Sequence, residues 1–259
     1  MAHTSAISSQ AVIALTAIVG ALQIANIARA AELTVLSPQA MKPALKDLIP
    51  QFERSYGYHV TVSYASTSVL LKEIEDGKVA DLAILYPQQI ERLKNDGEIV
   101  ENSMTPIATL AFGVIVRKGA AKPDVSTVHA LKQTLMNAKS IALGDPKNSA
   151  SGNYFANLIE RLQIGDAIKP KIKIFSSGAA AIEAVANGEA DLGVWVISSA
   201  YEPGTELAGT LPAQAKKLNA YAAGILTNSN QMQAAKVLLS FISSPNSLAV
   251  MHSKGFNPP

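Results

Sequence analysis

Apolar and polar residues follow one repeated pattern along most of the chain. A short apolar run leads into a loop of small hydroxyl or glycine residues, and a segment with apolar residues at helical spacing follows. The first copy has its strand at 33–36, its loop at 37–40 and its helix at 41–55, with Pro43 in the first helical turn, where a missing N–H costs little. This order of elements predicts a parallel α/β sheet.

Three further copies follow. Their strands and helices are expected at 59–64 and 69–76, at 140–143 and 152–162, and at 172–175 and 179–186. Two more apolar strands, 82–85 and 192–196, come directly after Asp81 and Asp191 in similar phrases, Gly-Lys-Val-Ala-Asp-Leu and Gly-Glu-Ala-Asp-Leu. The echo between these phrases predicts two lobes of similar design.

Two stretches of β character are expected to connect the lobes. One covers 107–117 and the other 220–226, and helices at 232–242 and 248–251 complete the chain. We therefore predict that lobe 1 consists of residues 31–112 plus 222–259 and that lobe 2 consists of residues 113–221. Each lobe should contain a mostly parallel sheet flanked by helices, with a ligand cleft between the lobes and the two crossing segments acting as a hinge.

The first thirty residues differ from the rest. They carry a single charged residue, Arg29, and an apolar run at 11–22 that precedes Ala28-Arg29-Ala30. Although residues 1–10 contain no Lys or Arg, this pattern predicts a signal peptide that is cleaved after Ala30 and directs the protein to the periplasm. The alternative, a membrane anchor, requires about 20 predominantly apolar residues, more than this run provides.

Charge and composition exclude several classes of function. Lys and Arg number 22 against 20 Asp and Glu, which leaves no basic surface for nucleic acid. The chain has no cysteine, so disulfides, thiolate metal sites and cysteine nucleophiles are excluded. The histidines match no catalytic triad, and the sequence has no phosphate-binding or dinucleotide-binding motif. We therefore expect no metal and no cofactor.

The loops of the repeat offer a different chemistry. In a parallel sheet they lie at the carboxyl edge of the strands, and each one leads into a helix N-terminus, where unpaired N–H groups and the helix dipole favour an anion. The hydroxyl residues in these loops are Ser66, Thr67, Ser68, Ser149, Ser151, Ser176 and Ser177. Any one of them is explained as an ordinary helix cap, but four such loops together favour an anion site.

At the same loops the sequence resembles the periplasmic molybdate-binding proteins of ABC transporters. The segments that carry the resemblance are Tyr64-Ala-Ser-Thr-Ser68 followed by Leu70 and 73–77, Ala80-Asp-Leu82, Gly144-Asp-Pro146 with Gly152 and Tyr154, Asn187-Gly-Glu-Ala190, and Lys254-Gly-Phe256. The resemblance implies the type II periplasmic binding fold. It also implies two lobes that close on a dehydrated oxyanion held by neutral hydroxyls and backbone amides.

Transferred position by position, the site of that family falls on Ala40, Thr67, Ser151, Gly178 and Val196. The resemblance implies that Thr67 acts through its hydroxyl and that Ser151 and Gly178 act through backbone N–H groups. The family typically has a serine where this chain has Ala40 and a tyrosine where it has Val196. Two missing donors favour an anion other than molybdate, one that is larger or flatter, such as a carboxylate.

Other nearby groups are available as donors. The full set of predicted ligand-binding residues is Ser37, Gln39, Ala40, Ser66, Thr67, Ser68, Tyr86, Ser151, Ser177, Gly178 and Val196. No catalytic residue is assigned.

Two functions remain open. The first is a receptor, expected to be monomeric, that captures a small anion and delivers it to an ABC permease in the inner membrane. The second is an enzyme similar to aconitate isomerase, because moving a proton along an unsaturated tricarboxylate requires only an anion site and a positioned acid or base. The empty list of catalytic motifs favours the receptor.

Overall fold

The computed structural model describes residues 32–259, so the predicted signal peptide lies outside the described residues. Ten strands form one sheet in the order β2-β1-β3-β9-β4-β7-β5-β6, with β8 and β10 also paired to β4. The strands are β1 (Glu32–Pro38), β2 (His59–Ala65), β3 (Leu82–Leu85), β4 (Thr105–Arg117), β5 (Ile141–Gly144), β6 (Ile172–Phe175), β7 (Leu192–Val196), β8 (Thr205–Thr210), β9 (Leu218–Ile225) and β10 (Phe256–Asn257).

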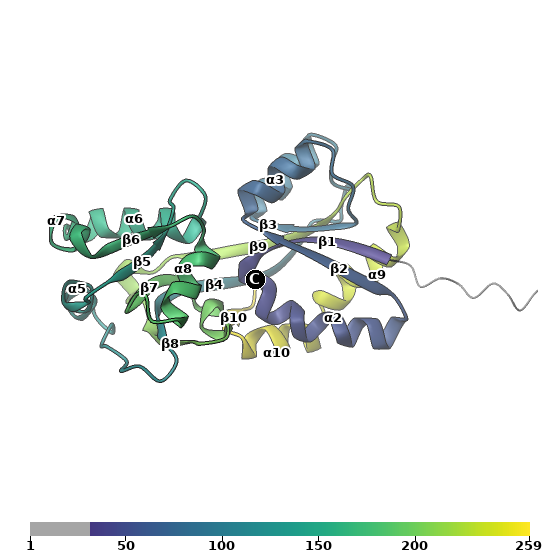
Figure 1. Ribbon diagram of the computed structural model, residues 1–259. Coiled ribbons are helices and arrows are strands. Elements are labelled where there is room, and N and C mark those ends of the chain that lie inside the picture. The colour runs from purple at the N-terminus through teal and green to yellow at the C-terminus, as the bar shows by residue number, and fades with distance from the viewer. Residues whose placement is uncertain (1–31) are drawn as a thin grey trace, which may run out of the picture. The chain divides into compact units, whose positions relative to one another are not determined.

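Helices alternate with these strands (Figure 1). The α-helices are α2 (Lys42–Tyr56), α3 (Thr67–Glu75), α4 (Pro87–Asn95), α5 (Val128–Asn137), α6 (Ala150–Leu162), α7 (Gly165–Ile168), α8 (Gly178–Ala186), α9 (Met232–Ile242) and α10 (Pro245–Ser253). Short 3-10 helices are η1 (Gln39–Met41), η2 (Lys169–Lys171), η3 (Ile197–Tyr201) and η4 (Ala213–Ala215). The four predicted strand–loop–helix copies correspond to β1–α2, β2–α3, β5–α6 and β6–α8.

Strand direction divides the sheet into two parts. Strand β1 pairs in parallel with β2 and β3, and β5 pairs in parallel with β6 and β7. Strand β4 is antiparallel to its neighbours: residues 105–111 pair with β9, and residues 112–117 pair with β7 and β8. We call β1, β2, β3, β9, β10 and the start of β4 the first part, and the remainder of β4 with β5–β8 the second part. The lobe boundaries at 112/113 and 221/222 and the hinge stay predictions.

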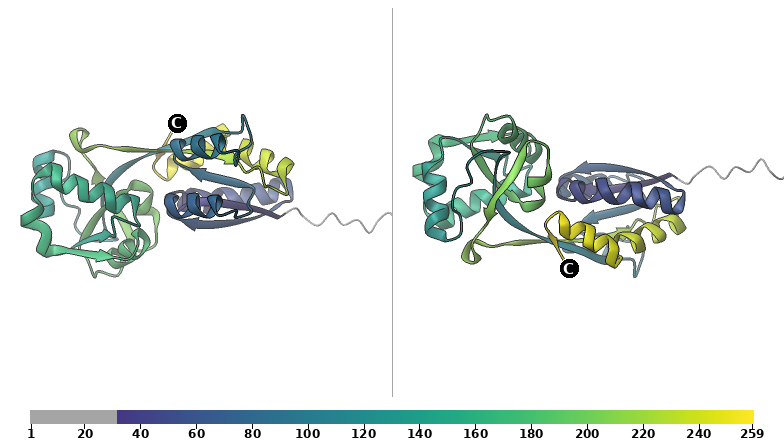
Figure 2. Two further views of the ribbon diagram at one scale, coloured as in Figure 1. Left: turned by 90° about the horizontal axis from the view of Figure 1, so that it is seen from above. Right: turned by 90° about the horizontal axis from the view of Figure 1, so that it is seen from below.

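Alternating side chains bury both faces of each part. In the first part, α2 and α9 lie on one face of the sheet and α3 lies on the other (Figures 1 and 2). Leu33 and Val35 pack with residues of α2 and α9, whereas Leu36 and Leu85 pack with residues of α3 and α4. In the second part, α5 and α6 cover one face, and α8 covers the other over Ile115, Ala142 and Trp195. The strands are therefore apolar on both sides, which leaves the loops at the strand ends as the place for polar chemistry.

Three elements are weak in the sequence pattern. Helices α4 and α5 each bury only two residues, Ile90 with Leu93 and Leu131 with Leu135, so their apolar periodicity is short. Strand β8 reads Thr-Glu-Leu-Ala-Gly-Thr and is mostly half-buried beside β4. In residues 32–259 no single helix has the length and apolarity to cross a membrane, although α9 and α10 pass that test as a pair bent by 59°.

Asp81 and Asp191, the aspartates of the repeated sequence phrase, make similar hydrogen bonds in the two parts. Asp81 accepts a hydrogen bond from the N–H of Thr34 at 2.7 Å and another from the hydroxyl of Ser229 at 2.6 Å. Asp191 accepts one from the N–H of Lys139 at 2.7 Å. In each part, a carboxylate placed just before one strand accepts a hydrogen bond from a backbone N–H group near the start of a neighbouring strand. The repeat seen in the sequence is thus a repeated structural device.

We expect Asp81→Ala to lower the free energy of unfolding by about 2–3 kcal/mol, because a buried carboxylate and two charge-assisted hydrogen bonds are lost and the Thr34 N–H is left unpaired. Urea denaturation followed by circular dichroism measures this change. Asp191→Ala, at an exposed position, is the matched control and should cost less. Equal losses at the two positions would contradict the assigned role of burial.

Candidate functional site

A cavity of about 680 Å³ lies where the strands of both parts end. The segments that follow β1, β2, β3, β5, β6 and β7 all contribute to its wall. These are the carboxyl ends of the parallel strands, the edge where open α/β sheets bind ligands. The loops of the sequence repeat therefore meet in one place.

Of the helices that begin at this cavity, three have a serine cap. Ser66 caps α3, Ser149 caps α6 and Ser177 caps α8, and their hydroxyls accept hydrogen bonds from backbone N–H groups at 3.4, 3.0 and 3.1 Å. The first two N–H groups of each helix lie ahead of the capped one and have no intrahelical acceptor. The residues of these first two positions that line the cavity are Thr67, Ala150, Ser151, Gly178 and Ala179.

Close backbone packing brings two of these helix ends together. A Cβ atom on Gly152 would overlap the carbonyl oxygen of Gly144, so only glycine lets α6 begin against the end of β5. A Cβ atom on Gly144 would lie 2.9 Å from the N–H nitrogen of Gly178 and 2.9 Å from the Ser149 hydroxyl. The N-termini of α6 and α8 thus sit beside each other next to β5.

The first part supplies neutral hydroxyls and an amide. The rings of Tyr86 and Tyr221 stack with their centroids 5.5 Å apart, and the amide nitrogen of Asn219 lies 3.4 Å from the Tyr86 hydroxyl. Burial raises the pKa of Tyr86, opposed by hydrogen bonds to Tyr221 and Thr67, and burial raises the pKa of Tyr221 well above its usual value. Both tyrosines therefore stay neutral at physiological pH and can donate to an anion.

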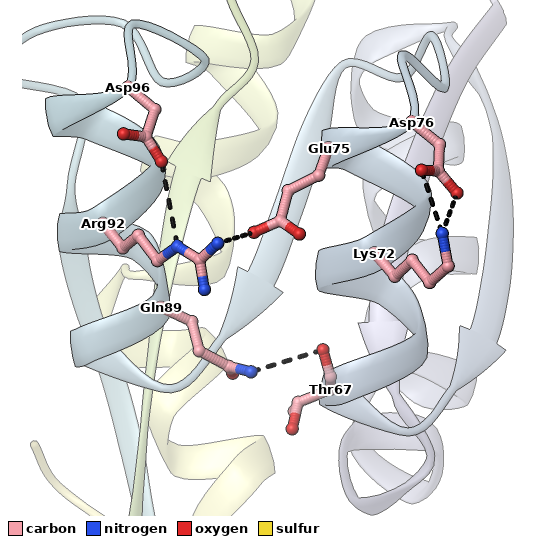
Figure 3. A network of polar contacts seen from close by, with 7 residues as sticks. All are labelled: Thr67, Lys72, Glu75, Asp76, Gln89, Arg92 and Asp96. Carbon is pink, nitrogen blue, oxygen red and sulfur yellow. Dashed lines mark hydrogen bonds and ion pairs between the residues drawn. The ribbon is translucent and has the colours of Figure 1, made fainter.

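Helix α4 fixes Thr67 beside Tyr86. The side chain of Gln89 donates to the carbonyl of Thr67 at 3.4 Å and accepts the N–H of Tyr86 at 3.2 Å. Figure 3 shows the same two helices joined farther along by Arg92 and Glu75, whose charged groups are 2.7 Å apart. Because this ion pair is on the surface it adds little stability. Gln89 is the contact that joins the start of α3 to that of α4.

Charged groups in the cavity wall were missed by sequence reasoning. They are Lys42, Glu183 and Glu202. The ammonium of Lys42, the first residue of α2, is 3.5 Å from the carboxylate of Glu202, which follows η3 in the second part. Burial and the nearby Glu202 carboxylate raise the pKa of Tyr64 to about 12. Lys42 and Glu202 are 160 positions apart, so no local pattern could have paired them.

Nine of the eleven predicted ligand-binding residues line this cavity: Gln39, Ala40, Ser66, Thr67, Tyr86, Ser151, Ser177, Gly178 and Val196. Ser37 and Ser68 do not. Ser37 is fully buried within β1, where its hydroxyl donates to the Pro38 carbonyl at 3.4 Å, and Ser68 is exposed on the outer side of α3. The binding role of all eleven stays a prediction.

Further cavity residues were not in the predicted set. Ser198 and Ser199 lie in η3, the segment that follows β7, so the loop pattern of the other strands could have pointed to them. The hydroxyl of Ser198 is buried and finds no hydrogen-bond partner among residues 32–259. Trp195 both packs in the core beside α8 and lines the cavity. Across the described range, no three His, Asp or Glu side chains are arranged to hold a metal ion.

A two-part α/β sheet whose helix N-termini and neutral hydroxyls line one cavity defines a solute-binding protein. The structure is similar to that of the periplasmic molybdate-binding protein of Azotobacter vinelandii, with a TM-score of 0.74 and 21% sequence identity over 88% of this chain and 99% of that one. The chain belongs to the bacterial extracellular solute-binding protein family, which it matches over residues 33–257. The predicted type II periplasmic binding fold and the resemblance to molybdate-binding proteins are confirmed.

Two curated relatives differ in what they do. One is an aconitate isomerase of a Pseudomonas species, 27% identical over 233 residues, with 87% of each chain covered. Another is the molybdate-binding protein ModA of Escherichia coli, 25% identical over 228 residues, with 87% of this chain and 88% of the relative covered. This chain is thus similar both to a molybdate-binding protein and to an aconitate isomerase.

We predict that Gly152→Ala lowers the free energy of unfolding by about 3 kcal/mol or more, because the added methyl overlaps the Gly144 carbonyl and forces α6 away from β5. Gly165→Ala is the matched control, since its added Cβ would be no closer than 3.8 Å to a neighbouring side chain. Urea denaturation compares the two variants. A loss at Gly152 no larger than that at Gly165 would refute the close-packing argument.

Proposed function

We propose that this chain is the periplasmic receptor of an ABC transporter, exported by its N-terminal signal, and that it captures a small anion in the cavity and delivers it to a membrane permease. The observation that carries the proposal is the meeting of three helix N-termini, those of α3, α6 and α8, at one cavity. Family membership supports the receptor role, and the site chemistry supports an anion.

The physical basis is hydrogen bonding from amides that have no other acceptor. An N–H group at a helix N-terminus carries part of the helix dipole, and a hydrogen bond to a charged acceptor contributes about 1.5–3 kcal/mol. Several such groups favour an anion without a matching number of cationic side chains. The serine caps add hydroxyl donors, because a hydroxyl that accepts one hydrogen bond still has a proton to donate.

The cavity favours a carboxylate over a tetrahedral oxyanion. Its volume is about 680 Å³, and two positions that would face a compact oxyanion, Ala40 and Val196, have no side-chain donor. The polar groups of Gln39, Tyr86 and Ser177 are spread around the wall instead. A ligand with several separated oxygens uses such a distribution better than a small tetrahedron does.

We expect Ala150→Pro to weaken anion binding by about tenfold, because it removes one cavity N–H while proline is tolerated as the first residue of a helix. The preceding residue, Ser149, already has the extended backbone that proline requires. Calorimetry and thermal shift would use molybdate, sulfate, glutarate, tricarballylate and trans-aconitate, and a bound anion should raise the melting temperature.

Val128→Pro is the matched control, since Val128 is the first residue of α5 and does not line this cavity. It should leave anion affinity unchanged. If none of the five anions stabilised or bound the unaltered chain, the proposed function would be wrong. If Ala150→Pro bound as tightly as the unaltered chain, the N-terminal amides would not be the binding groups.

A second candidate is an isomerase of the aconitate type, and the pair of Lys42 and Glu202 favours it. A carboxylate and an ammonium 3.5 Å apart in the cavity wall could act as base and acid. The base would take a proton from the carbon next to the double bond. The double bond would then shift by one position, and a proton would return at its far end, so that no oxidant or cofactor is consumed.

This alternative is tested by following trans-aconitate with the purified protein in D₂O by NMR. An isomerase converts the compound and incorporates deuterium at carbon, and Glu202→Gln abolishes both changes. A receptor binds without conversion. Binding seen by calorimetry with no conversion over hours would exclude the isomerase.

A further inference from the structure

We infer that Lys42 is a specificity-determining residue that binds a carboxylate of the ligand other than the one at the helix N-termini, and that Glu202 holds Lys42 in place until that carboxylate arrives. The ligand class is then a polycarboxylate. The inference rests on the proposed anion capture and adds the charge that the ligand must carry.

The positive charge of Lys42 stands out in the cavity wall. Of the residues within 32–259 that line the cavity, it is the single one with a positive charge, whereas two, Glu183 and Glu202, carry a negative one. An anion site built only from amides would not require a cation. Because two carboxylates in the wall repel an anion, a ligand of high negative charge requires a cation in the cavity.

The position of Lys42 on its helix is also unfavourable in itself. It is the first residue of α2 and directly follows the single turn of η1, so it lies near the N-terminal end of a helical segment, where the helix dipole opposes a positive charge. The first turn of α2 contains no acidic residue that would compensate locally. Helix stability therefore does not explain a lysine here, whereas a ligand does.

The backbone of Glu202 is held by Thr205. Its carbonyl accepts hydrogen bonds from the hydroxyl of Thr205 at 2.9 Å and from the N–H of Thr205 at 3.2 Å. Its side chain is 20% exposed, and that of Lys42 is 31% exposed, so both remain accessible from the cavity. Glu202 comes from the second part and Lys42 from the first, so the pair joins two walls.

Exchange of partners at Lys42 has a low cost. A partly exposed ion pair at 3.5 Å contributes little net free energy, because solvent screens it. A ligand carboxylate that replaces Glu202 beside the ammonium restores an equivalent pair while the other carboxylate is held by the helix amides. A ligand with a single carboxylate can satisfy only one of these positions.

Two probes that differ by one carboxylate test this directly. Glutarate has the carbon skeleton of butyrate with an additional carboxylate at the far end of the chain. At pH 8, calorimetry should show that the unaltered chain binds glutarate about tenfold more tightly than butyrate. Lys42→Gln should remove most of this difference. Glu202→Gln should strengthen glutarate binding by about threefold to tenfold, since a like charge is lost and Lys42 is released.

Matched variants separate this role from a general effect of charge. Lys46→Gln removes an exposed lysine one turn along α2, outside the cavity, and should change neither affinity. Glu183→Gln removes the other cavity carboxylate, leaves the ion pair intact and should strengthen both probes. The signature of the inferred role is that Lys42→Gln removes the advantage of glutarate over butyrate, whereas the other variants keep it.

Three results would overturn the inference: equal loss of both probes in Lys42→Gln, weaker glutarate binding in Glu202→Gln, or binding of molybdate with neither carboxylate probe bound. In the last case anion capture would stand and only the ligand class would fall. If the unaltered chain bound no anion at all, the proposed function would fall with it.

Discussion

Every α-helix begins with backbone N–H groups that its own turns cannot pair, and these groups must meet water, a cap or a ligand. In this protein that constraint organises the structure. Strands β2, β5 and β6 run so that α3, α6 and α8 all start at one edge, and the cavity lies where they start. The packing of Gly144 against Gly152 and Gly178 brings two of these starts closer than any side chain would permit.

The same constraint shows that capping and binding need not compete. The hydroxyls of Ser66, Ser149 and Ser177 accept hydrogen bonds from the third N–H group of their helices. Each hydroxyl keeps its own proton, and the two preceding amides stay without an intrahelical acceptor. A residue that stabilises the helix can therefore also present a donor to the cavity, and the two interpretations of these serines describe one arrangement.

The local half of the structure was predictable from the sequence, because strands, loops and helix starts depend on near neighbours. The strand–loop–helix repeat predicted β1–α2, β2–α3, β5–α6 and β6–α8, and nine of the eleven site residues line one cavity. Ser37 and Ser68 do not line the cavity because β1 and α3 have slightly different bounds from those predicted. Strand β1 extends through Ser37 and buries it, and α3 begins at Thr67, which leaves Ser68 on the outside. Lys42 and Glu202 were not predictable, since only the folded chain brings them together.

The one tryptophan of the chain, Trp195, is in the cavity wall. Its indole packs over Gly193 and lies in the core beside α8, at the border between packed interior and cavity. Indole emission changes with the polarity around the ring, and no second tryptophan dilutes the signal. The fluorescence of Trp195 therefore reports on occupancy of the cavity, and binding can be followed in real time in the unlabelled protein.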